Sequence, residues 1–524
     1  MKKLFLLFAL GFILINCGGS QKGISKAKAP ANPVDYATTI TADELKEMLY
    51  IYASDEFEGR ETGQPGQRKA AEYLKTQYQN MGIKSPLSGD DYFQEVPLEK
   101  QKVAEAYFTV NGKTFLTFED QITLALPGNV AINTKDMIYA GYGIDHENYS
   151  DYKDLDVTGK VVLVKSGEPK DVNGNYVTSK TFGPTNWTNG RQSLYSKRDA
   201  AKKNGAKAIL FMDNGLFYRY SPYFKSQAES GSTGRLSLKS NEESMLFMIV
   251  NENLGKALYA NILEDDTPKV INTDLSITAE NKSESVISEN VVAFIEGSEK
   301  PDEIVVISAH LDHEGIKNGE VYNGADDDGS GTIALLEIAE AFKMAANDGN
   351  APKRSILFLH VTGEERGLLG SKHYTDNDPI FPLENTVADL NIDMVGRTDP
   401  KRKDGDRNYV YLIGSDKLST DLHNISEDVN QKYCNIELDY KYNDENDPNR
   451  FYYRSDHYNF AKNNIPVIFY FNGTHDDYHQ PSDTPDKIEY DLLENRTRLI
   501  FHTAWELANR DERIVVDKAK QAKP

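Results

Sequence analysis

The run EIVVISAHLD at residues 303–312 decides the fold of this chain. It is an apolar stretch of strand length, followed directly by the polar side chains of His310 and Asp312. A helix over 332–345 and a second apolar strand over 355–361 come next. Strand and helix in alternation are typical of a largely parallel sheet that helices cover on both faces. We therefore predict an α/β fold with polar groups gathered at the carboxyl ends of its strands.

The same periodicity predicts further elements on either side of this core. Towards the N-terminus, a helix begins at the capping residue Thr41 and a second helix runs over 66–80. Later in the chain, a helix over 367–374 and buried strands over 389–394 and 466–471 continue the alternation. We expect a central sheet that is mostly parallel or mixed.

Five short segments place a metal-seeking or proton-handling side chain where the chain is expected to turn. They are SAHLD (308–312), GADDDG (324–329), GEE (363–365), NIDM (391–394) and DYH (477–479). Together they supply two imidazoles, two carboxylates and one carboxylate able to bridge, with a spare glutamate alongside. That is the inventory of a two-zinc hydrolase. Because they fall at or beyond strand ends, the five segments can converge in space.

Single residues in these segments also have plainer interpretations. Asp326 or Asp328 could cap the following helix, and Asp312 could cap a loop. The adjacent Glu364 and Glu365 could be an ordinary surface pair. Three carboxylates in one turn repel one another, however, and a dication would relieve that repulsion. The histidine segments favour zinc over calcium.

The remaining histidines and cysteines need no catalytic role. His360 lies in an apolar strand and is interpreted as a hydrogen-bonded core residue, and His373 as a group on a helix surface. His457 and His475 could either line the pocket or pack in the interior. Cys434 has no second cysteine or histidine at ligand spacing, so we expect a partly buried, inert thiol.

Length and charge limit the classes of function. The chain has 524 residues, more than one hydrophobic core usually serves, so at least two domains are expected. It carries 59 Lys and Arg against 81 Asp and Glu, a net charge of -22. An acidic surface repels phosphate backbones, and we therefore expect no nucleic-acid partner.

The N-terminus has the features of an export signal. Two lysines precede an apolar run over 4–15, which is too short to span a membrane comfortably. The following sequence LINC ends at Cys17 and resembles the lipobox of bacterial lipoproteins. This resemblance implies acylation of Cys17, with the polar residues after it as a flexible tether. We expect a periplasmic or cell-surface protein that a lipid at Cys17 anchors to the membrane.

The five segments, in this order, resemble the co-catalytic di-zinc exopeptidase family, which includes bacterial leucyl-type aminopeptidases and glutamate carboxypeptidase. The resemblance implies that two Zn²⁺ ions are bound. One would be held by His310 and Asp393, and the other by Glu365 and His479. Asp327 would bridge the two ions.

The same resemblance implies catalytic roles for three more residues. Glu364 takes the place of the general base, and Asp312 that of the carboxylate behind His310. Tyr478 matches a tyrosine that donates to the tetrahedral oxyanion. His313 stands where many members of the family have serine.

Three further segments, IYAGYG (138–143), TGKVVLV (158–164) and AAKKNGAKAI (200–209), resemble the protease-associated domain that is inserted in several exopeptidases. We expect a smaller, β-rich insert without a catalytic constellation. The predicted division of the chain is a signal peptide (1–16), a lipidated Cys17 with its tether (17–33), a first part of the peptidase domain (34–136), the insert (137–282), a second part of the peptidase domain (283–511) and a C-terminal tail (512–524).

We interpret the chain as a zinc metallopeptidase and favour an aminopeptidase, which hydrolyses N-terminal residues from peptides through a two-zinc-activated water with Glu364 as general base. A carboxypeptidase stays open, because Arg454 and Arg450 could bind the terminal carboxylate of a substrate. A one-zinc glutaminyl cyclase and a catalytically inactive surface binding protein are further alternatives. The expected partners are peptide substrates, with membrane contact only through the lipid anchor.

Overall fold

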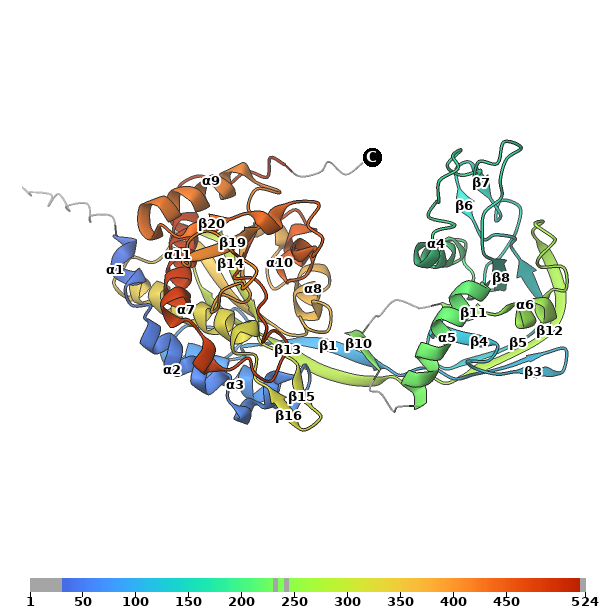
Figure 1. Cartoon of the computed structure of the whole chain (residues 1–524), viewed down its shortest axis with the longest axis horizontal. Helices are drawn as coiled ribbons and strands as arrows, with labels where there is room; N and C mark the ends of the chain where they lie inside the picture. The colour runs from blue at the N-terminus through green and yellow to red at the C-terminus, as the bar shows by residue number, and fades with distance from the viewer. Residues whose placement is uncertain (1–30, 230–233, 240–244, 519–524) are drawn as a thin grey trace, which may run out of the picture.

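The computed structural model describes residues 31–229, 234–239 and 245–518. Figure 1 shows them as two lobes that are joined by long strands. The predicted signal peptide, Cys17 and most of the tether lie outside the described residues. Among the described helices, none combines the length and apolar character needed to cross a bilayer.

The first lobe is built on a nine-stranded mixed sheet. In order across the sheet its strands are β10 (Arg235–Leu238), β1 (Phe93–Gln101), β13 (Glu284–Ile295), β17 (Arg354–Val361), β14 (Lys300–His310), β18 (Thr386–Ile392), β21 (Val467–Phe471), β19 (Tyr409–Ile413) and β20 (Glu437–Asp439). The central strands β17, β14, β18 and β21 run parallel, and antiparallel strands flank them on both sides. The prediction of a mostly parallel or mixed sheet is confirmed.

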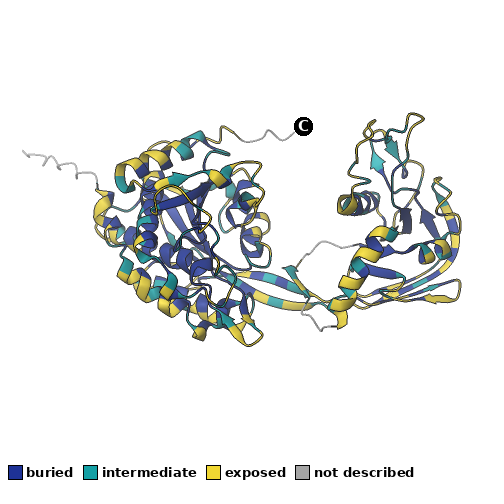
Figure 2. Cartoon of the chain, in the orientation of Figure 1, coloured by how far each residue is buried: buried dark blue, intermediate teal, exposed yellow. Residues whose placement is uncertain are grey.

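Helices cover both faces of this sheet. One face carries α1 (Pro33–Ala37), α2 (Ala42–Tyr52), α3 (Pro65–Met81), α7 (Gly331–Asn347), α9 (Thr420–Val429) and α11 (Tyr490–Asn509), and the other carries α8 (Leu369–Asp376) and α10 (His457–Ala461). Alternation along β14 supplies both cores, since Val305 and Ile307 pack on the first side while Ile304 and Val306 pack on the second. Figure 2 shows the strands buried beneath helices with exposed outer faces.

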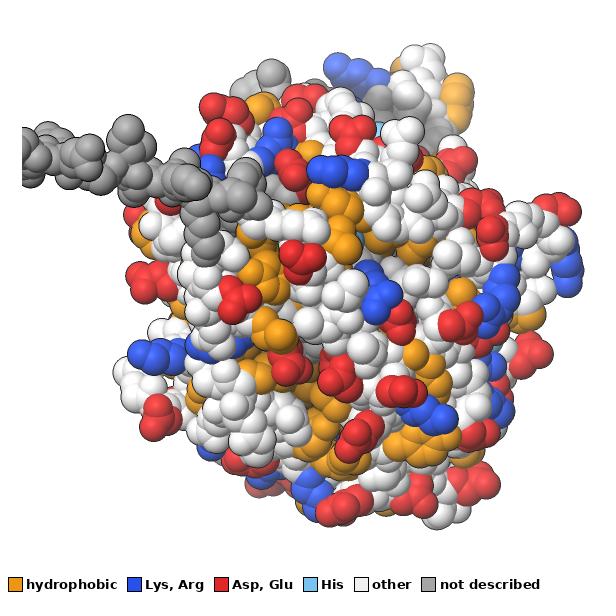
Figure 3. Space-filling view, turned by 90° about the vertical axis from the view of Figure 1, so that its left-hand side faces the viewer, with side chains coloured by type: hydrophobic (Ala, Val, Ile, Leu, Met, Phe, Trp, Pro, Cys, Tyr) orange, Lys and Arg blue, Asp and Glu red, His pale blue; other side chains and the backbone are white. Residues whose placement is uncertain are grey.

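Local sequence explains where the predicted helices begin and end. The hydroxyl of Thr41 accepts the N–H of Glu44 at the start of α2, as the predicted cap requires. Gly82 has a φ of 68° and ends α3 in the left-handed conformation. Acidic side chains lie over the face shown in Figure 3, with lysine and arginine among them, in keeping with the net charge of -22.

The second lobe contains an eight-stranded sheet with helices on both of its faces. Its strands, in order, are β3 (Lys113–Phe115), β2 (Ala106–Val110), β12 (Lys269–Ala279), β5 (Val130–Tyr139), β8 (Val161–Lys165), β9 (Ala208–Met212), β11 (Leu246–Val250) and β4 (Gln121–Ala125). Its helices are α4 (Gly190–Lys203), α5 (Asn214–Glu229) and α6 (Glu252–Leu258). Two short hairpins stand apart from these sheets: β6–β7 (Asp145–His146 and Tyr149–Ser150) in the second lobe, and β15–β16 (Gly315–Lys317 and Glu320–Tyr322) in the first lobe.

The boundaries of the second lobe differ from the predicted insert. Its sheet begins at Ala106 rather than at residue 137, because β2 pairs with β12 and β4 pairs with β11. Conversely, β10 lies within the predicted insert but pairs with β1 of the first lobe. β10 thereby covers an edge that β1 would otherwise expose. The identity of the second lobe as a protease-associated domain stays a prediction.

Candidate metal centre

The five predicted metal ligands lie together at the carboxyl ends of the central strands of the first lobe's sheet. β14 ends at His310, and Glu365 and Asp393 closely follow β17 and β18. His479 lies in the loop after β21, and Asp327 lies in the turn that precedes α7. Because β14 pairs in parallel with both β17 and β18, the carboxyl ends of these strands meet. The structure therefore contains the predicted convergence, while the role of each residue stays a prediction.

Asp327 is the central member of this group. Its Oδ1 lies 3.2 Å from Nε2 of His310, and its Oδ2 lies 3.0 Å from Nε2 of His479. Each imidazole has a second carboxylate beside it. Asp393 Oδ1 lies 3.7 Å from His310 Nε2. Glu365 Oε1 lies 3.2 Å from His479 Nε2. One carboxylate thus faces two imidazole and carboxylate pairs, as a ligand shared by two neighbouring cations would.

Unpartnered polar atoms at the centre of this group test whether the residues fit a metal. Nε2 of His310, Oε1 of Glu365 and both ring nitrogens of His313 are buried and have no hydrogen-bond partner among the residues that the structure describes. Buried polar atoms without partners are rare and costly in folded proteins. Imidazole nitrogens and carboxylate oxygens at these separations are the donors that zinc prefers. The residues present fit zinc.

The imidazoles and carboxylates of this group shift one another's pKa values. Burial alone would lower the pKa of His310, but Asp327 and Asp393 outweigh it and hold that pKa well above its usual range. In the same way, Asp327 and Glu365 overcome burial and raise the pKa of His479 to about 10. Burial would raise the pKa of Asp327, yet the two histidines hold it well below its usual value. Because an imidazole must lose its proton to bind a cation, metal binding here would release protons.

Asp312 is placed differently from the prediction. Nδ1 of His310 is hydrogen-bonded to the main-chain carbonyl of Asp312 at 2.9 Å, while the Asp312 carboxylate lies 3.9 Å away. That carboxylate instead accepts the Thr62 hydroxyl at 2.6 Å and the main-chain N–H of Glu364 at 3.1 Å. These two donors occupy the carboxylate, which stays within ion-pair distance of His310 but is not hydrogen-bonded to it. Asp312 therefore orients His310 through its backbone and fixes the loop of Glu364 through its side chain.

Asp328 lies beside the group but is already fully engaged. Its Oδ2 accepts the main-chain N–H of His310 at 3.1 Å. Its Oδ1 accepts the N–H groups of Gly331 at 3.0 Å and Met394 at 3.1 Å. The bond to Gly331 reaches the first residue of α7, although Ser330 occupies the cap position of that helix. Asp328 therefore joins the ends of β14 and β18 to the start of α7, and it also lies with His310 and Asp393 in a group that could hold a metal ion.

Asp483 and His475 support the turn that carries Asp327. The carboxylate of Asp483 accepts the N–H of Asp326 at 3.0 Å and that of Asp327 at 3.2 Å. His475 contributes through Nε2, which lies 3.1 Å from Oδ2 of Asp326. His475 thus stabilises the turn. The sequence did not indicate a role for Asp483, because nothing in its local sequence distinguishes it from an ordinary surface aspartate.

His313 and Glu314 also lie at the site, although the sequence predicted no role for either. Nδ1 of His313 lies 2.9 Å from Oε1 of Glu365. Oε1 of Glu314 lies 3.4 Å from Nδ1 of His479, where a carboxylate can orient that ring. The signal that could have found them is their position in the run HLDHE, directly after His310.

Arg60 is the main positioning residue that sequence reasoning missed. It is 1% exposed, and its guanidinium donates to three main-chain carbonyls of the site. These are the carbonyls of Leu311 at 3.2 Å, Asn323 at 2.7 Å and Gly324 at 2.9 Å. Arg60 therefore ties the end of β14 to the turn of Asp327. Local sequence does not reveal a contact between residues so distant along the chain.

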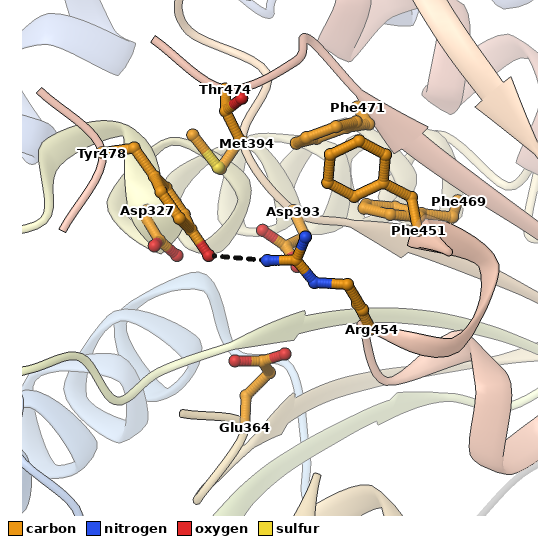
Figure 4. A pocket seen from close by; sticks show the side chains of 10 residues that line it. All are labelled: Asp327, Glu364, Asp393, Met394, Phe451, Arg454, Phe469, Phe471, Thr474 and Tyr478. Carbon is orange, nitrogen blue, oxygen red and sulfur yellow. Dashed lines mark hydrogen bonds between the residues drawn. The ribbon is translucent and has the colours of Figure 1, made fainter. Parts of the chain in front are cut away.

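A pocket opens directly beside the group. It is lined by Asp327, Glu364, Asp393, Met394, Phe451, Arg454, Phe469, Phe471, Thr474 and Tyr478. In Figure 4, Glu364 lies across the pocket from the two aspartates, and phenyl rings form one wall. Nη2 of Arg454 lies 3.4 Å from the hydroxyl of Tyr478. The pocket thus combines carboxylates, a phenol, a cation and an apolar surface.

Two pocket residues have shifted proton affinities. Burial raises the pKa of Glu364 well above its ordinary value, and Glu365 and Asp393 act in the same direction against His310. Burial and the neighbouring carboxylates also raise the pKa of Tyr478 above its usual range. The phenol therefore stays protonated and can donate a hydrogen bond into the pocket.

The other histidines and Cys434 lie outside this group. His360 is hydrogen-bonded to the Tyr78 hydroxyl at 2.8 Å, which confirms a core residue, and burial lowers its pKa to about 3. His457 is buried against an aromatic ring and packs in the interior. His373 is buried at 7% exposure, so its predicted place on a helix surface is wrong, because α8 packs against neighbouring elements on that side. Cys434 is partly buried, and burial raises its pKa to about 12.

The α/β fold carries imidazole and carboxylate donors at the ends of its strands. These residues form a candidate metal centre that is suited to zinc. Comparison with known proteins finds a family that part of this chain resembles. Residues 290–504 match the model of peptidase family M28. That segment supplies all five predicted ligands together with Glu364 and Tyr478. The predicted resemblance to zinc exopeptidases is confirmed.

Individual relatives are moderately similar. Aminopeptidase YwaD of Bacillus subtilis (strain 168) is 27% identical over 243 residues, which are 43% of this chain and 50% of the relative. Aminopeptidase Y of Saccharomyces cerevisiae is 26% identical over 339 residues, 62% of this chain and 55% of the relative. The chain thus spans about half the length of these two curated relatives. A solved zinc aminopeptidase from Bacillus subtilis is 18% identical with a TM-score of 0.45, over 92% of this chain and 99% of that one.

Proposed function

We propose that this protein is a zinc-dependent exopeptidase and, specifically, an aminopeptidase that removes N-terminal residues from peptides. The observation that carries the proposal is the position of Asp327, whose two oxygens lie 3.2 Å and 3.0 Å from the imidazoles of His310 and His479. In this proposal His310 and Asp393 hold one zinc ion, Glu365 and His479 hold a second, and Asp327 is shared. Zinc bound there would supply Lewis-acid chemistry and lower the pKa of water.

The chain's own residues would handle the protons. Glu364 presents its carboxylate across the pocket from Asp327 and Asp393, where it can accept a proton from water and deliver it to the leaving amine. Asp312 fixes the backbone of Glu364 by accepting its N–H. The protonated hydroxyl of Tyr478 faces the same space and can donate to the oxyanion that forms at the scissile carbonyl.

The apolar wall of the pocket indicates which substrates it would take. Phe451, Phe469 and Phe471, with Met394, form a surface beside the carboxylates that would bury an apolar side chain. Burial of such a side chain would position the scissile bond next to Glu364. We therefore expect a preference for peptides with an apolar N-terminal residue.

A second candidate function, a carboxypeptidase, is favoured by one specific observation. Arg454 is exposed at the pocket, and no ion-pair partner is found for it within residues 31–229, 234–239 and 245–518. A guanidinium in that position could bind the terminal carboxylate of a peptide. Nη2 of Arg454 hydrogen-bonds to the hydroxyl of Tyr478, which gives it a role in an aminopeptidase as well.

Blocked peptides separate these two functions. The wild-type protein is assayed on peptides that carry either an acetylated N-terminus or an amidated C-terminus, with and without a zinc chelator. An aminopeptidase cleaves the amidated peptides only, and loses activity with the chelator. Cleavage of the acetylated peptides only, with a KM that rises about tenfold in Arg454→Gln, would establish the carboxypeptidase instead. Absence of cleavage in both sets would contradict both functions.

We also propose that the protein is exported and attached to a membrane through acylated Cys17, and that its partners are peptides and not nucleic acids. The apolar run over 4–15 and the sequence LINC support the anchor, and the net charge of -22 supports the absence of nucleic acid. Labelling of cells with a fatty-acid analogue tests the anchor, with Cys434→Ser as the matched control. Label in the wild type and in Cys434→Ser but not in Cys17→Ser is expected, and equal label in all three would contradict it.

A further inference from the structure

His313 is a buried imidazole that the five-ligand set leaves without a role. Its side chain is fully buried, and neither ring nitrogen has a hydrogen-bond partner among the described residues. Nδ1 points at the carboxylates of the site, 2.9 Å from Oε1 of Glu365 and 3.8 Å from Oδ2 of Asp327. An unpartnered imidazole aimed at two carboxylates has the features of a metal ligand.

Packing around His313 keeps this ring in place. Gly324 has a φ of 53°, and a Cβ at that position would lie 2.5 Å from ring atoms of His313. Only glycine therefore allows the turn before Asp327 to pass so close to the ring. The ring also meets His479 edge to face, with the centroids 5.7 Å apart. The local sequence thus fits a histidine at position 313 and holds it against the site.

We propose that His313 is an additional ligand of the second zinc ion, through Nδ1, together with Glu365, His479 and Asp327. The proposal rests on the function proposed above, which places zinc at this group. Two ligand atoms that each lie 2.0–2.1 Å from a tetrahedral zinc are roughly 3.4 Å apart. Four separations among these donor atoms bracket that value: 2.9 Å, 3.0 Å, 3.2 Å and 3.8 Å.

The consequence is an asymmetric pair of sites. The second ion would have four ligand atoms from the protein, which is the number found in closed structural zinc sites. The first ion would have only His310, Asp393 and the shared Asp327, and would keep one position open, as catalytic sites do. The second ion is therefore held more tightly and exchanges more slowly than the first.

His457 provides an internal comparison for His313. It too is fully buried, and both of its ring nitrogens lack hydrogen-bond partners among the described residues. Its ring, however, stacks on Phe469 at 4.7 Å, and in the part of the chain that the structure describes no carboxylate lies within ion-pair distance of it. Loss of His457 therefore removes a buried imidazole without removing a ligand.

The test is zinc retention in full-length protein against graded chelator, measured as zinc per folded chain. The matched pair is His313→Cys and His313→Ser, since both leave the same space but only cysteine supplies a strong zinc ligand. Wild type, His457→Gln and His313→Cys should keep the second ion at chelator concentrations that remove it from His313→Ser. The expected loss of affinity for that ion in His313→Ser is at least tenfold. Cobalt substitution gives a second readout, because the absorption bands should differ between His313→Ser and wild type.

The outcomes distinguish a failure of the proposed role of His313 from a failure of the proposed zinc peptidase function. Equal retention and identical cobalt spectra in wild type and in both His313 variants would overturn the role of His313 while leaving the zinc peptidase intact. A folded wild type that binds no zinc would overturn both. Circular dichroism confirms folding of each variant, and retention that is higher in His313→Cys than in His313→Ser supports ligation even if both variants are less stable than wild type.

Discussion

Oδ2 of Asp327 lies 3.0 Å from Nε2 of His479, although Asp327 precedes α7 and His479 follows β21, the last strand of the chain. The other oxygen of Asp327 is engaged equally closely, at 3.2 Å from His310. The carboxylate can face both sides because Asp483 and Arg60 hold its turn from behind through backbone hydrogen bonds. A single turn thus places one carboxylate between the imidazoles of His310 and His479.

Replacement of the proposed general base should separate chemistry from metal binding. Glu364→Gln keeps the shape of the side chain but cannot accept a proton, so kcat should fall by about 10² to 10⁴-fold. Zinc content should be unchanged, because Glu364 is not among the proposed ligands. The measurements are kcat on an amidated peptide and zinc per chain in the same preparation. Loss of zinc from this variant would mean that Glu364 is a ligand and that the roles of the glutamate pair are reversed.

Tyr478→Phe removes the hydroxyl that faces the pocket without changing the ring. If the phenol donates to the developing oxyanion, kcat should fall about 10²-fold while KM changes little, since the interaction forms only in the transition state. Tyr453→Phe is the matched control, because Tyr453 is exposed at 45% and does not line the pocket. A rise in KM with unchanged kcat would assign Tyr478 to substrate binding instead.

Arg60→Met should destabilise the protein through the site it supports. The variant leaves the carbonyls of Leu311, Asn323 and Gly324 without their donor, at a cost of about 3 kcal/mol in the free energy of unfolding. Arg68→Met, at an exposed ion pair with Glu289, should cost less than about 1 kcal/mol. Urea unfolding of both variants measures this difference. Equal stability of the two would show that the Arg60 hydrogen bonds do not hold the turn.

Glu337 should make stability depend on pH. It lies in α7 at 3% exposure, and burial, with Glu44 and Glu340 nearby, raises its pKa from 4.5 to about 8. The folded state therefore binds the proton more tightly than the unfolded state between those values, and stability falls as pH rises through that window. Glu337→Gln should remove this loss and be more stable than wild type at pH 8 by up to about 4 kcal/mol, with little difference at pH 4.5.

Urea unfolding at several pH values measures this effect. Glu506→Gln, on the exposed side of α11, is the control and should follow the wild type at every pH. A stability difference between Glu337→Gln and wild type that does not grow with pH would contradict the raised pKa.

Much of the first lobe follows from local sequence. The strands that end at or shortly before His310, Glu365 and Asp393 were predicted because they are short apolar runs bounded by turns. The helix α2 was predicted because Thr41 caps it. The boundary of the second lobe could not be predicted from local sequence. Which sheet a strand joins depends on long-range pairing, such as that of Ala106 with Ala279, and local periodicity carries no information about it.

The meeting of the five predicted ligands could be predicted because metal chemistry demands particular residue types at strand ends. The residues that support them could not. Arg60 and Asp483 act on backbone atoms, and such contacts leave no pattern in the sequence. Asp312 was expected to hold His310 by its carboxylate, but spacing alone does not reveal that Thr62 and Glu364 already occupy that group. In the sequence, His313 was notable only as a departure from the family. Its buried position, 2.9 Å from Glu365, is what indicates a role at the site.

Zinc content per folded chain is the most direct measurement of whether these side chains form a metal centre. It should be determined for the purified wild type, for Asp327→Asn and for the exposed control Asp444→Asn after dialysis against metal-free buffer. The expected result is two zinc ions in wild type and in Asp444→Asn, and fewer than one in Asp327→Asn, which weakens both sites at once. A folded wild-type chain that binds no zinc from zinc-containing buffer, or an Asp327→Asn chain that retains as much zinc as wild type, would contradict a shared carboxylate between two metal positions.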